Sequence, residues 1–214
     1  MALAAAGLLG AVAWLLLGSR FLVVRSIQVT GTHLVPKSEV LAAAAIPDGV
    51  PLIRVNTGAA ASRIDRIPQV LSAQVSRQWP DGLLITVTER RPALAVPLVG
   101  GGFALVDPAG VVLRTAHAQP PGIPRFIPAG PLAGNPGVRA AAAVLRQLPA
   151  GIGRRVTSVT VPTADAVTLH LAGRITVDWG SAGQSAQKAR VLAILMHTHA
   201  HYYDVSAPGT AVTG

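Results

Sequence analysis

The sequence predicts an α+β protein in which an N-terminal transmembrane helix precedes two mixed domains. Three observations lead to this prediction. Residues 1–17 carry no charged side chain, runs of alternating apolar and polar residues then lie between segments with helical spacing, and this pattern changes in character at Pro92. We therefore expect a transmembrane anchor at residues 1–24, a first domain at residues 25–91 and a second domain at residues 92–214.

The apolar N-terminal run is long enough to cross a bilayer, which takes roughly 20 residues. It is interrupted at residues 18–20, which include Arg20, and it resumes at Phe21–Val24. A cleaved signal peptide is the alternative, but it would need charges before the apolar core and a small-residue cleavage site after it. The sequence shows neither feature. We therefore expect an anchor that stays in the mature protein, with Arg20 reaching the membrane interface.

The first domain begins with a predicted strand and two short helices. Ile27 and Val29 alternate with polar residues, which is typical of a strand. Pro36 suits the first position of a helix, and Asn56 is a good N-cap for a second helix. Pro68 then forces the chain out of the second helix.

Two alternating runs complete the first domain as a hairpin. Leu71, Ala73 and Val75 are expected on one face of the first run, and residues 83–87 provide the second run. Between the runs lies the sequence Trp-Pro-Asp-Gly at residues 79–82, which is a strong turn signal. The predicted order of the first domain is therefore β-α-α-β-β.

The second domain is predicted to be a mixed β domain with two helices. Three short apolar runs separated by turn residues indicate a β-meander, at residues 96–98, 103–106 and 111–113. A proline-rich connection leads to a helix for which Asn135 and Pro136 are placed as caps. The remaining elements are strands near residues 156–161, 167–171 and 175–179, a last helix at about 185–199, and strand-like segments at 202–205 and 210–212.

Short motifs follow one another in a specific order along both domains. In the first domain they are Ile27-x-Val29-x-Gly31, the segment from Pro68 to Pro80, and the strand end Glu89-Arg90-Arg91-Pro92, which together resemble a POTRA domain. In the second they are Val106-Asp107-x-x-Gly110, the helix entry at 180–188, and Tyr203-Asp204-Val205-Ser206-x-Pro208. The whole chain, residues 1–214, resembles the FtsQ/DivIB family of bacterial cell-division proteins, whose members carry a POTRA domain and a β domain.

The resemblance implies a non-catalytic scaffold of the division machinery that binds and recruits other division proteins. The implied partners are FtsB/DivIC-like and FtsL-like proteins, and the implied location is the cell membrane. A POTRA-type chaperone or transport module for membrane or secreted proteins is the alternative, although the repeated POTRA units of such modules are lacking.

The resemblance also implies a single-pass topology with the C-terminal domains extracytoplasmic. Arg20 and Arg25 taken alone would place that side in the cytoplasm by the positive-inside rule. Family members usually carry a charged cytoplasmic tail before the anchor, and a missing tail would account for the conflict. We follow the topology of the family.

The C-terminal segment is the predicted partner site. Residues 210–213 are β-prone and uncharged, and they are expected to turn back along residues 202–205 as an edge strand open to strand addition. A frayed terminus is the alternative. By resemblance, this edge and the last helix receive the FtsB/DivIC partner, and the predicted partner-binding residues are Lys188, Arg190, Tyr203, Thr210, Ala211, Val212 and Thr213.

Composition and residue types argue against several other functions. The net charge of +9 favours anionic surfaces, but scattered arginines and few aromatics argue against nucleic acid. His197, His199 and His201 could hold a metal, although the solvent-facing end of a helix is the more ordinary interpretation. The seven aspartates lie mainly in turns, and no catalytic set is evident. We expect no enzyme activity, no cofactor, no metal and no small-molecule substrate.

Overall fold

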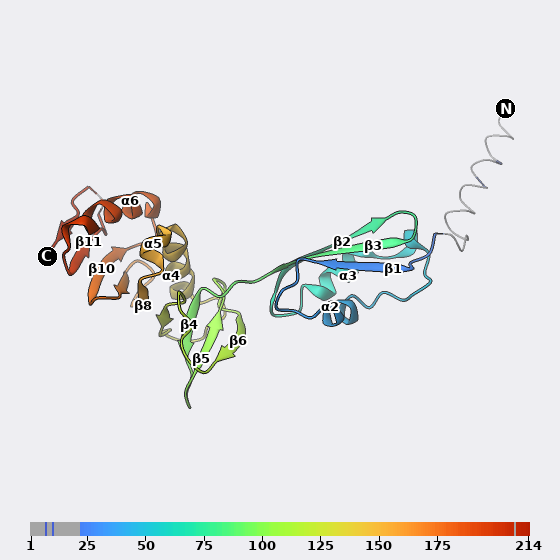
Figure 1. Cartoon of the computed structure of the whole chain (residues 1–214), viewed down its shortest axis with the longest axis horizontal. Helices are drawn as coiled ribbons and strands as arrows, with labels where there is room; N and C mark the ends of the chain where they lie inside the picture. Colours follow the sequence, from blue (N-terminus) through green and yellow to red (C-terminus); the bar gives the residue numbers. More distant parts are fainter. Residues whose placement is uncertain (1–6, 8–9, 11–21, 208) are drawn as a thin grey trace. The chain divides into compact units, whose positions relative to one another are not determined.

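The computed structural model describes residues 7, 10, 22–207 and 209–214. Within this part the chain forms two compact units, the first ending at Arg90 and the second beginning at Arg91 (Figure 1). The predicted transmembrane helix lies mostly outside the described residues. Among those described, no helix combines the length and the apolar character needed to cross a membrane.

Unit 1 is a three-stranded sheet with helices on one face. The strands follow the order β1-β3-β2, in which β1 runs parallel and β2 antiparallel to β3. Its elements are β1 (Ser26–Thr30), α2 (Lys37–Ala44), η1 (Leu52–Arg54), α3 (Thr57–Ile64), β2 (Val70–Gln78) and β3 (Gly82–Glu89). The β-α-α-β-β order predicted from the sequence is thus the order observed, with the 3-10 turn η1 added between the helices.

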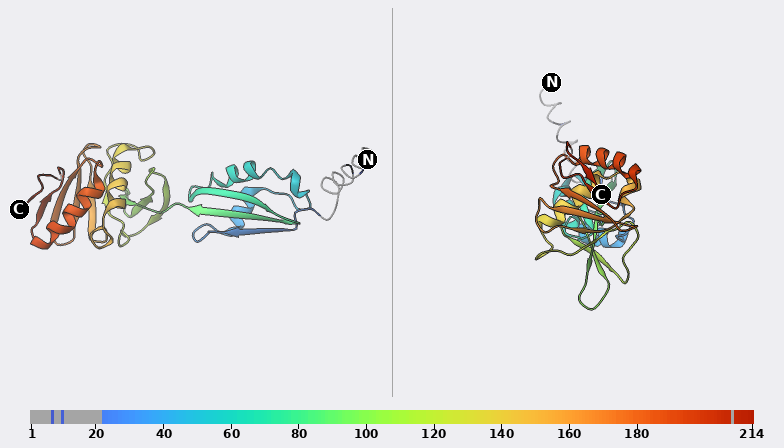
Figure 2. Two further views of the ribbon diagram at one scale, coloured as in Figure 1. Left: turned by 90° about the horizontal axis from the view of Figure 1, so that it is seen from above. Right: turned by 90° about the vertical axis from the view of Figure 1, so that its left-hand side faces the viewer.

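The core of unit 1 lies between the sheet and the helices. Val40 and Ala44 of α2, and Ala60 and Ile64 of α3, are fully buried against the apolar face of the strands. Asn56 caps α3 as predicted, because its side-chain oxygen accepts a hydrogen bond from the Ala59 N–H at 2.9 Å. Figure 2 shows α2 and α3 on the same side of the sheet.

Two features at the ends of this unit differ from the sequence prediction. Leu71 was expected to share the apolar face of Ala73 and Val75, but a register shift between Val70 and Ser72 leaves Leu71 exposed and buries Val70. Val24, assigned to the anchor from its hydropathy, is 2% exposed within the core of unit 1. The packed unit therefore begins before Arg25.

Unit 2 is built on a nine-stranded mixed sheet with the order β12-β11-β10-β9-β8-β7-β4-β5-β6. The predicted meander forms one end of the sheet, as β4 (Leu94–Pro97), β5 (Phe103–Val106) and β6 (Val112–Ala116). The two-residue strand β7 (Arg125–Phe126), which the proline-rich sequence did not indicate, joins β4 to β8 in parallel. The other strands are β8 (Val156–Thr160), β9 (Val167–Leu171), β10 (Ile175–Gly180), β11 (Tyr202–Asp204) and β12 (Val212–Thr213).

The helices of unit 2 pack with the sheet around one apolar core. They are α4 (Pro136–Gln147), the short α5 (Ala150–Gly153) and α6 (Ser185–Leu195), which continues as the 3-10 turn η2 (Met196–Thr198). Asn135 caps α4 as predicted, since its side-chain oxygen accepts hydrogen bonds from the N–H groups of Gly137 and Val138. The core contains Val138 of α4, Leu192 of α6 and Trp179 of β10. The α+β class predicted from the sequence is confirmed for both units.

Candidate functional site at the C-terminal edge

The last residues of the chain form the outermost strands of the large sheet. After η2, strand β11 pairs in parallel with β10, and β12 returns antiparallel to β11. Because β12 ends the strand order, no strand of the described part lies beyond it (Figure 1). The return of residues 212–213 along residues 203–204 agrees with the hairpin expected from the sequence.

The hydrogen-bond register decides which backbone groups of β12 face outward. Tyr202 and Gly214 exchange both of their backbone hydrogen bonds, at 3.0 and 3.1 Å. In an antiparallel pair, such residue pairs alternate with pairs that do not bond each other. Thr213, which lies opposite Tyr203, therefore directs its N–H and C=O away from β11. Val212, opposite Asp204, directs its backbone groups inward.

The side chains of this edge carry no charge that would block another strand. Residues 210–214 include no Asp, Glu, Lys or Arg, and the Val212 side chain is 59% exposed. Sheet edges that avoid association usually carry charges, proline or a covering element. An outward-facing donor and acceptor on an uncharged, partly apolar strand is the arrangement that strand addition requires.

A polar network on the neighbouring strands fixes the position of β11. The Tyr202 hydroxyl donates to Asp178 Oδ2 at 2.8 Å, and Thr168 Oγ1 donates to Asp178 Oδ1 at 2.9 Å. The hydrogen bond to the Asp178 carboxylate raises the pKa of Tyr202, with smaller contributions from partial desolvation and from the charges of Asp178 and Asp204. Sequence reasoning did not identify this network, although the polar positions of β9 and β10 alternate with buried ones.

Lys188 lies inside unit 2 and not on its surface. Its side chain is 1% exposed, and Nζ donates to the backbone carbonyls of Trp179 at 2.8 Å and Ser181 at 3.0 Å. Desolvation lowers the pKa of Lys188, and the negative charge of Asp204 partly opposes that effect. The long side chain lies inside the unit and ties α6 to the end of β10, and a contact of Lys188 with acidic partner residues stays a prediction.

Comparison with known proteins relates both units to one family. The profile of the FtsQ-type POTRA domain matches residues 22–90. The profile of the C-terminal region of cell division protein FtsQ/DivIB matches residues 95–206. The chain belongs to the FtsQ/DivIB family. The division role inferred from the motifs is thereby confirmed at the level of the family.

Several FtsQ proteins of actinobacterial species resemble this FtsQ/DivIB chain over most of its length. Cell division protein FtsQ of Streptomyces griseus is 39% identical over 201 residues, covering 89% of this chain and 96% of that protein. The Streptomyces venezuelae protein is 39% identical over 207 residues, covering 91% of this chain and 75% of its own. The Mycobacteroides abscessus protein is 36% identical over 185 residues, covering 86% and 59%.

The structure divides the predicted site residues of this FtsQ/DivIB protein into three groups. Residues 210–213 lie at or beside the sheet edge. Arg190 is exposed on α6, where it and Arg146 line a shallow groove of about 460 Å³ between α4 and α6. Lys188 and Tyr203 are both 1% exposed, so their side chains lie inside unit 2.

The three C-terminal histidines are not gathered into a metal site. His197 lies in η2, His199 follows it with a left-handed backbone, and His201 directly precedes β11. Within the part of the chain that is described, no group of three His, Cys, Asp or Glu side chains is placed to hold a metal ion. All three histidines are exposed, as expected for the end of a surface helix.

Proposed function

We propose that this protein is a non-catalytic, membrane-anchored scaffold that binds other division proteins through the outer edge of β12. The observation that carries the proposal is the register of β12, which turns the N–H and C=O of Thr213 away from β11. A partner strand placed there would extend the nine-stranded sheet by one. The partners implied by family resemblance are FtsB/DivIC-like and FtsL-like proteins.

The proposed location is the cell membrane, with an anchoring segment that ends before the packed residues 22–24 and with both units extracytoplasmic. The uncharged run at residues 1–17 supports a span, and it ends just before the first described residues of unit 1. Confinement to the membrane raises the effective concentration of the β12 edge toward partners in the same plane. Even a modest strand-addition affinity is then sufficient for recruitment.

The proposed partner surface also includes Arg190 and the backbone around Thr210 and Ala211. Arg190 lies on the exposed face of α6, where it can meet acidic partner residues. Ala211 packs against the core of unit 2 and so holds the start of β12 in place. Tyr203 and Lys188 are proposed to support the edge from inside.

A substitution at Thr213 tests the strand-addition site. Thr213→Pro removes the outward N–H while keeping the intrachain pairing of Tyr202 with Gly214, and we expect about a 10-fold loss of affinity for the extracytoplasmic segment of a DivIC-like partner. Thr213→Ala keeps the N–H and should bind within about twofold of the unchanged protein. The measurement is titration of the partner onto the full-length protein in nanodiscs. Wild-type affinity in Thr213→Pro would exclude the β12 edge.

A further inference from the structure

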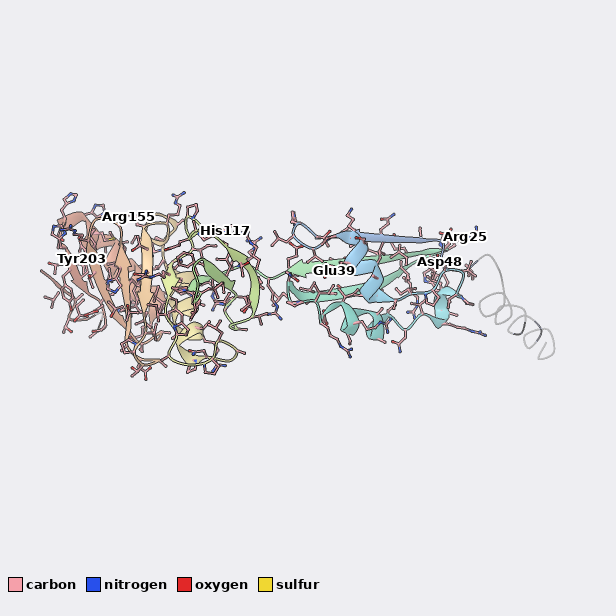
Figure 3. The ribbon with its side chains drawn as sticks, turned by 90° about the horizontal axis from the view of Figure 1, so that it is seen from below. Arg25, Glu39, Asp48, His117, Arg155 and Tyr203 are labelled. Atoms are coloured by element: carbon pink, nitrogen blue, oxygen red, sulfur yellow. The ribbon has the colours of Figure 1, made fainter. Side chains whose placement is uncertain are left out.

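The first residues of unit 1 are bonded to a loop at one end of the unit. The Leu52 N–H donates to Leu22 O at 2.8 Å, the Val24 N–H donates to Val50 O at 2.9 Å, and the Gly49 N–H donates to Val24 O at 3.2 Å. The loop that contains η1 is therefore fixed beside residues 22–24. Figure 3 shows the same proximity from the labelled Arg25 and Asp48.

The tip of the β2–β3 hairpin meets the chain at this same end. The N–H groups of Arg25 and Ser26 both donate to Asp81 O, at 2.9 and 3.3 Å. The guanidinium of Arg77, just before the tip, donates to Leu52 O at 2.9 Å and to Val55 O at 2.7 Å. The hairpin tip, η1 and residues 22–26 thus form one hydrogen-bonded end of the unit, which we call the entry end.

The entry end exposes large apolar side chains. Trp79 at the hairpin tip is 52% exposed and Ile53 of η1 is 41% exposed, whereas Trp179, the other tryptophan of the described residues, is fully buried. Tryptophan is enriched where membranes meet water, because its large apolar ring carries one polar N–H. Exposing the Trp79 and Ile53 side chains to water costs free energy that contact with an apolar phase would recover.

Charges at the entry end are mixed rather than strongly basic. Arg25 and Arg54 lie at its surface together with Asp48, while Asp81 is half-buried. Attraction to anionic headgroups is therefore modest, and the apolar side chains determine what this end can bind. A lipid surface fits them, since only residues 18–21 lie between residue 22 and the apolar run at residues 1–17.

We infer that the entry end of unit 1 docks on the bilayer, with Trp79 and Ile53 in the interfacial layer. The inference rests on the proposed anchor, because the anchor brings residue 22 to the membrane. Docking gives unit 1 a second contact with the membrane in addition to the anchor. This second contact fixes the tilt of the unit relative to the membrane, whereas the anchor alone would leave the unit free to rotate. The contact involves the lipid acyl boundary and does not require a particular headgroup.

Trp79 provides its own probe for this contact. The full-length protein is reconstituted in phosphatidylcholine vesicles with lipids brominated near the headgroup, and tryptophan emission is compared between Trp14→Phe and Trp14→Phe combined with Trp79→Phe. Bromine should quench the first protein and leave the second nearly unquenched, because Trp179 is buried in unit 2. Equal quenching in the two proteins would overturn the docking.

A matched pair of variants separates docking from general changes in the unit. In the Trp14→Phe protein, Ile53→Ser should lower the quenched fraction by about twofold, because it removes the second apolar contact. Leu71→Ser removes a comparably exposed side chain at the opposite end of β2 and should leave quenching unchanged. Equal effects of both substitutions would contradict the inference.

The anchor itself is tested separately by Trp14, which lies within the apolar run. Lipids brominated deep in the acyl chains should quench the unchanged protein more than Trp14→Phe. Loss of that difference would exclude the anchor, whereas deep quenching of Trp14 without shallow quenching of Trp79 would exclude only the docking.

Discussion

The carboxylate of Glu89 joins the end of β3 to the loop before α2. It accepts hydrogen bonds from the backbone N–H groups of His33, Leu34 and Val35, each at 2.9 Å. Partial desolvation raises the pKa of Glu89. The three hydrogen bonds and the nearby His33 lower it by a larger amount together, so the net pKa lies below its ordinary value of 4.5. The ionised carboxylate therefore stabilises unit 1.

Replacing Glu89 tests this contribution and its pH dependence. At pH 7 we expect Glu89→Gln to lower the free energy of unfolding by about 1 kcal/mol, because a half-exposed site weakens charge-assisted bonds. The stabilisation is complete above the ordinary pKa and is lost as pH falls through the lowered pKa of the folded state. The difference from the unchanged protein should therefore shrink as the pH falls below 4.5 and through the lowered pKa of the folded state.

Urea titrations of the detergent-solubilised chain at several pH values, followed by circular dichroism, measure this difference. Glu39→Gln is the matched control, since Glu39 is the other glutamate of the chain and is exposed in the first turn of α2. A pH-independent effect of Glu89→Gln would mean that the carboxylate charge does not hold the loop.

Replacing Lys188 tests whether its buried hydrogen bonds stabilise unit 2. Lys188→Met keeps the aliphatic stem but leaves the carbonyls of Trp179 and Ser181 without their donor, and should cost about 1–3 kcal/mol of unit 2 stability. Arg190→Met on the exposed face of α6 should change stability by less than about 0.5 kcal/mol. Urea unfolding followed by Trp179 fluorescence distinguishes them. Equal stability of both variants would mean that the hydrogen bonds of Lys188 do not stabilise unit 2.

In helix α2 the backbone conformation of a residue decides whether its substitution by glycine raises or lowers the stability of unit 1. The helix ends at Ala44, and its C-cap residue Ala45 has a φ of 46°, in the left-handed region that favours glycine. Ala45→Gly should stabilise unit 1 by about 0.5–1 kcal/mol, because it removes the Cβ contact. Ala42→Gly, at an exposed position inside the same helix, should destabilise by about 0.5–1 kcal/mol. The midpoint temperatures of thermal unfolding should therefore shift in opposite directions for the two variants. Shifts of the same sign would contradict the assignment of Ala45 as the C-cap.

Elements with strong local signals were predictable from the sequence, and elements that depend on distant contacts were not. Alternation and caps identified α3, α4 and the β2–β3 hairpin, because periodicity and N-cap chemistry are local. Strand β7 is two residues long within a proline-rich stretch and exists because β4 and β8 lie on either side of it. The parallel pairing of β10 with β11 likewise depends on α6 carrying the chain across.

At the candidate site, too, the features with a local sequence signal were predictable and those that depend on distant contacts were not. The edge position of residues 212–213 followed from an uncharged β-prone tail after a turn signal, whereas the outward direction of Thr213 needed the register. The interior position of Lys188 could not be predicted, because an (i, i+4) pattern with Leu192 also fits an ordinary boundary lysine. The Leu71 error has a similar origin, since a bulge interrupts alternation without a sequence signal of its own.

At the scale of the whole molecule, we expect the two units to unfold independently. Each has its own apolar core, and the first unit ends at Arg90 where the second begins at Arg91. Fragments 22–91 and 92–214 should each unfold cooperatively in urea. A fragment that begins at Arg25 should be less stable than 22–91 by about 2 kcal/mol, because it lacks the buried Val24 side chain. A single transition of the full chain that neither fragment reproduces would refute two independent units.

Strand β7 has a mechanical consequence under the membrane anchoring and partner binding proposed above. Load applied at β12 would pass along the strand order through β7 to β4, the strand at which the chain enters unit 2. That strand is coupled to β4 by one residue pair and to β8 by two, while the buried Phe126 ring adds its packing. In force spectroscopy with handles at residues 22 and 214, rupture should begin between β4 and β7. The protein would then lengthen under tension while strands β7 to β12 and unit 1 remain folded.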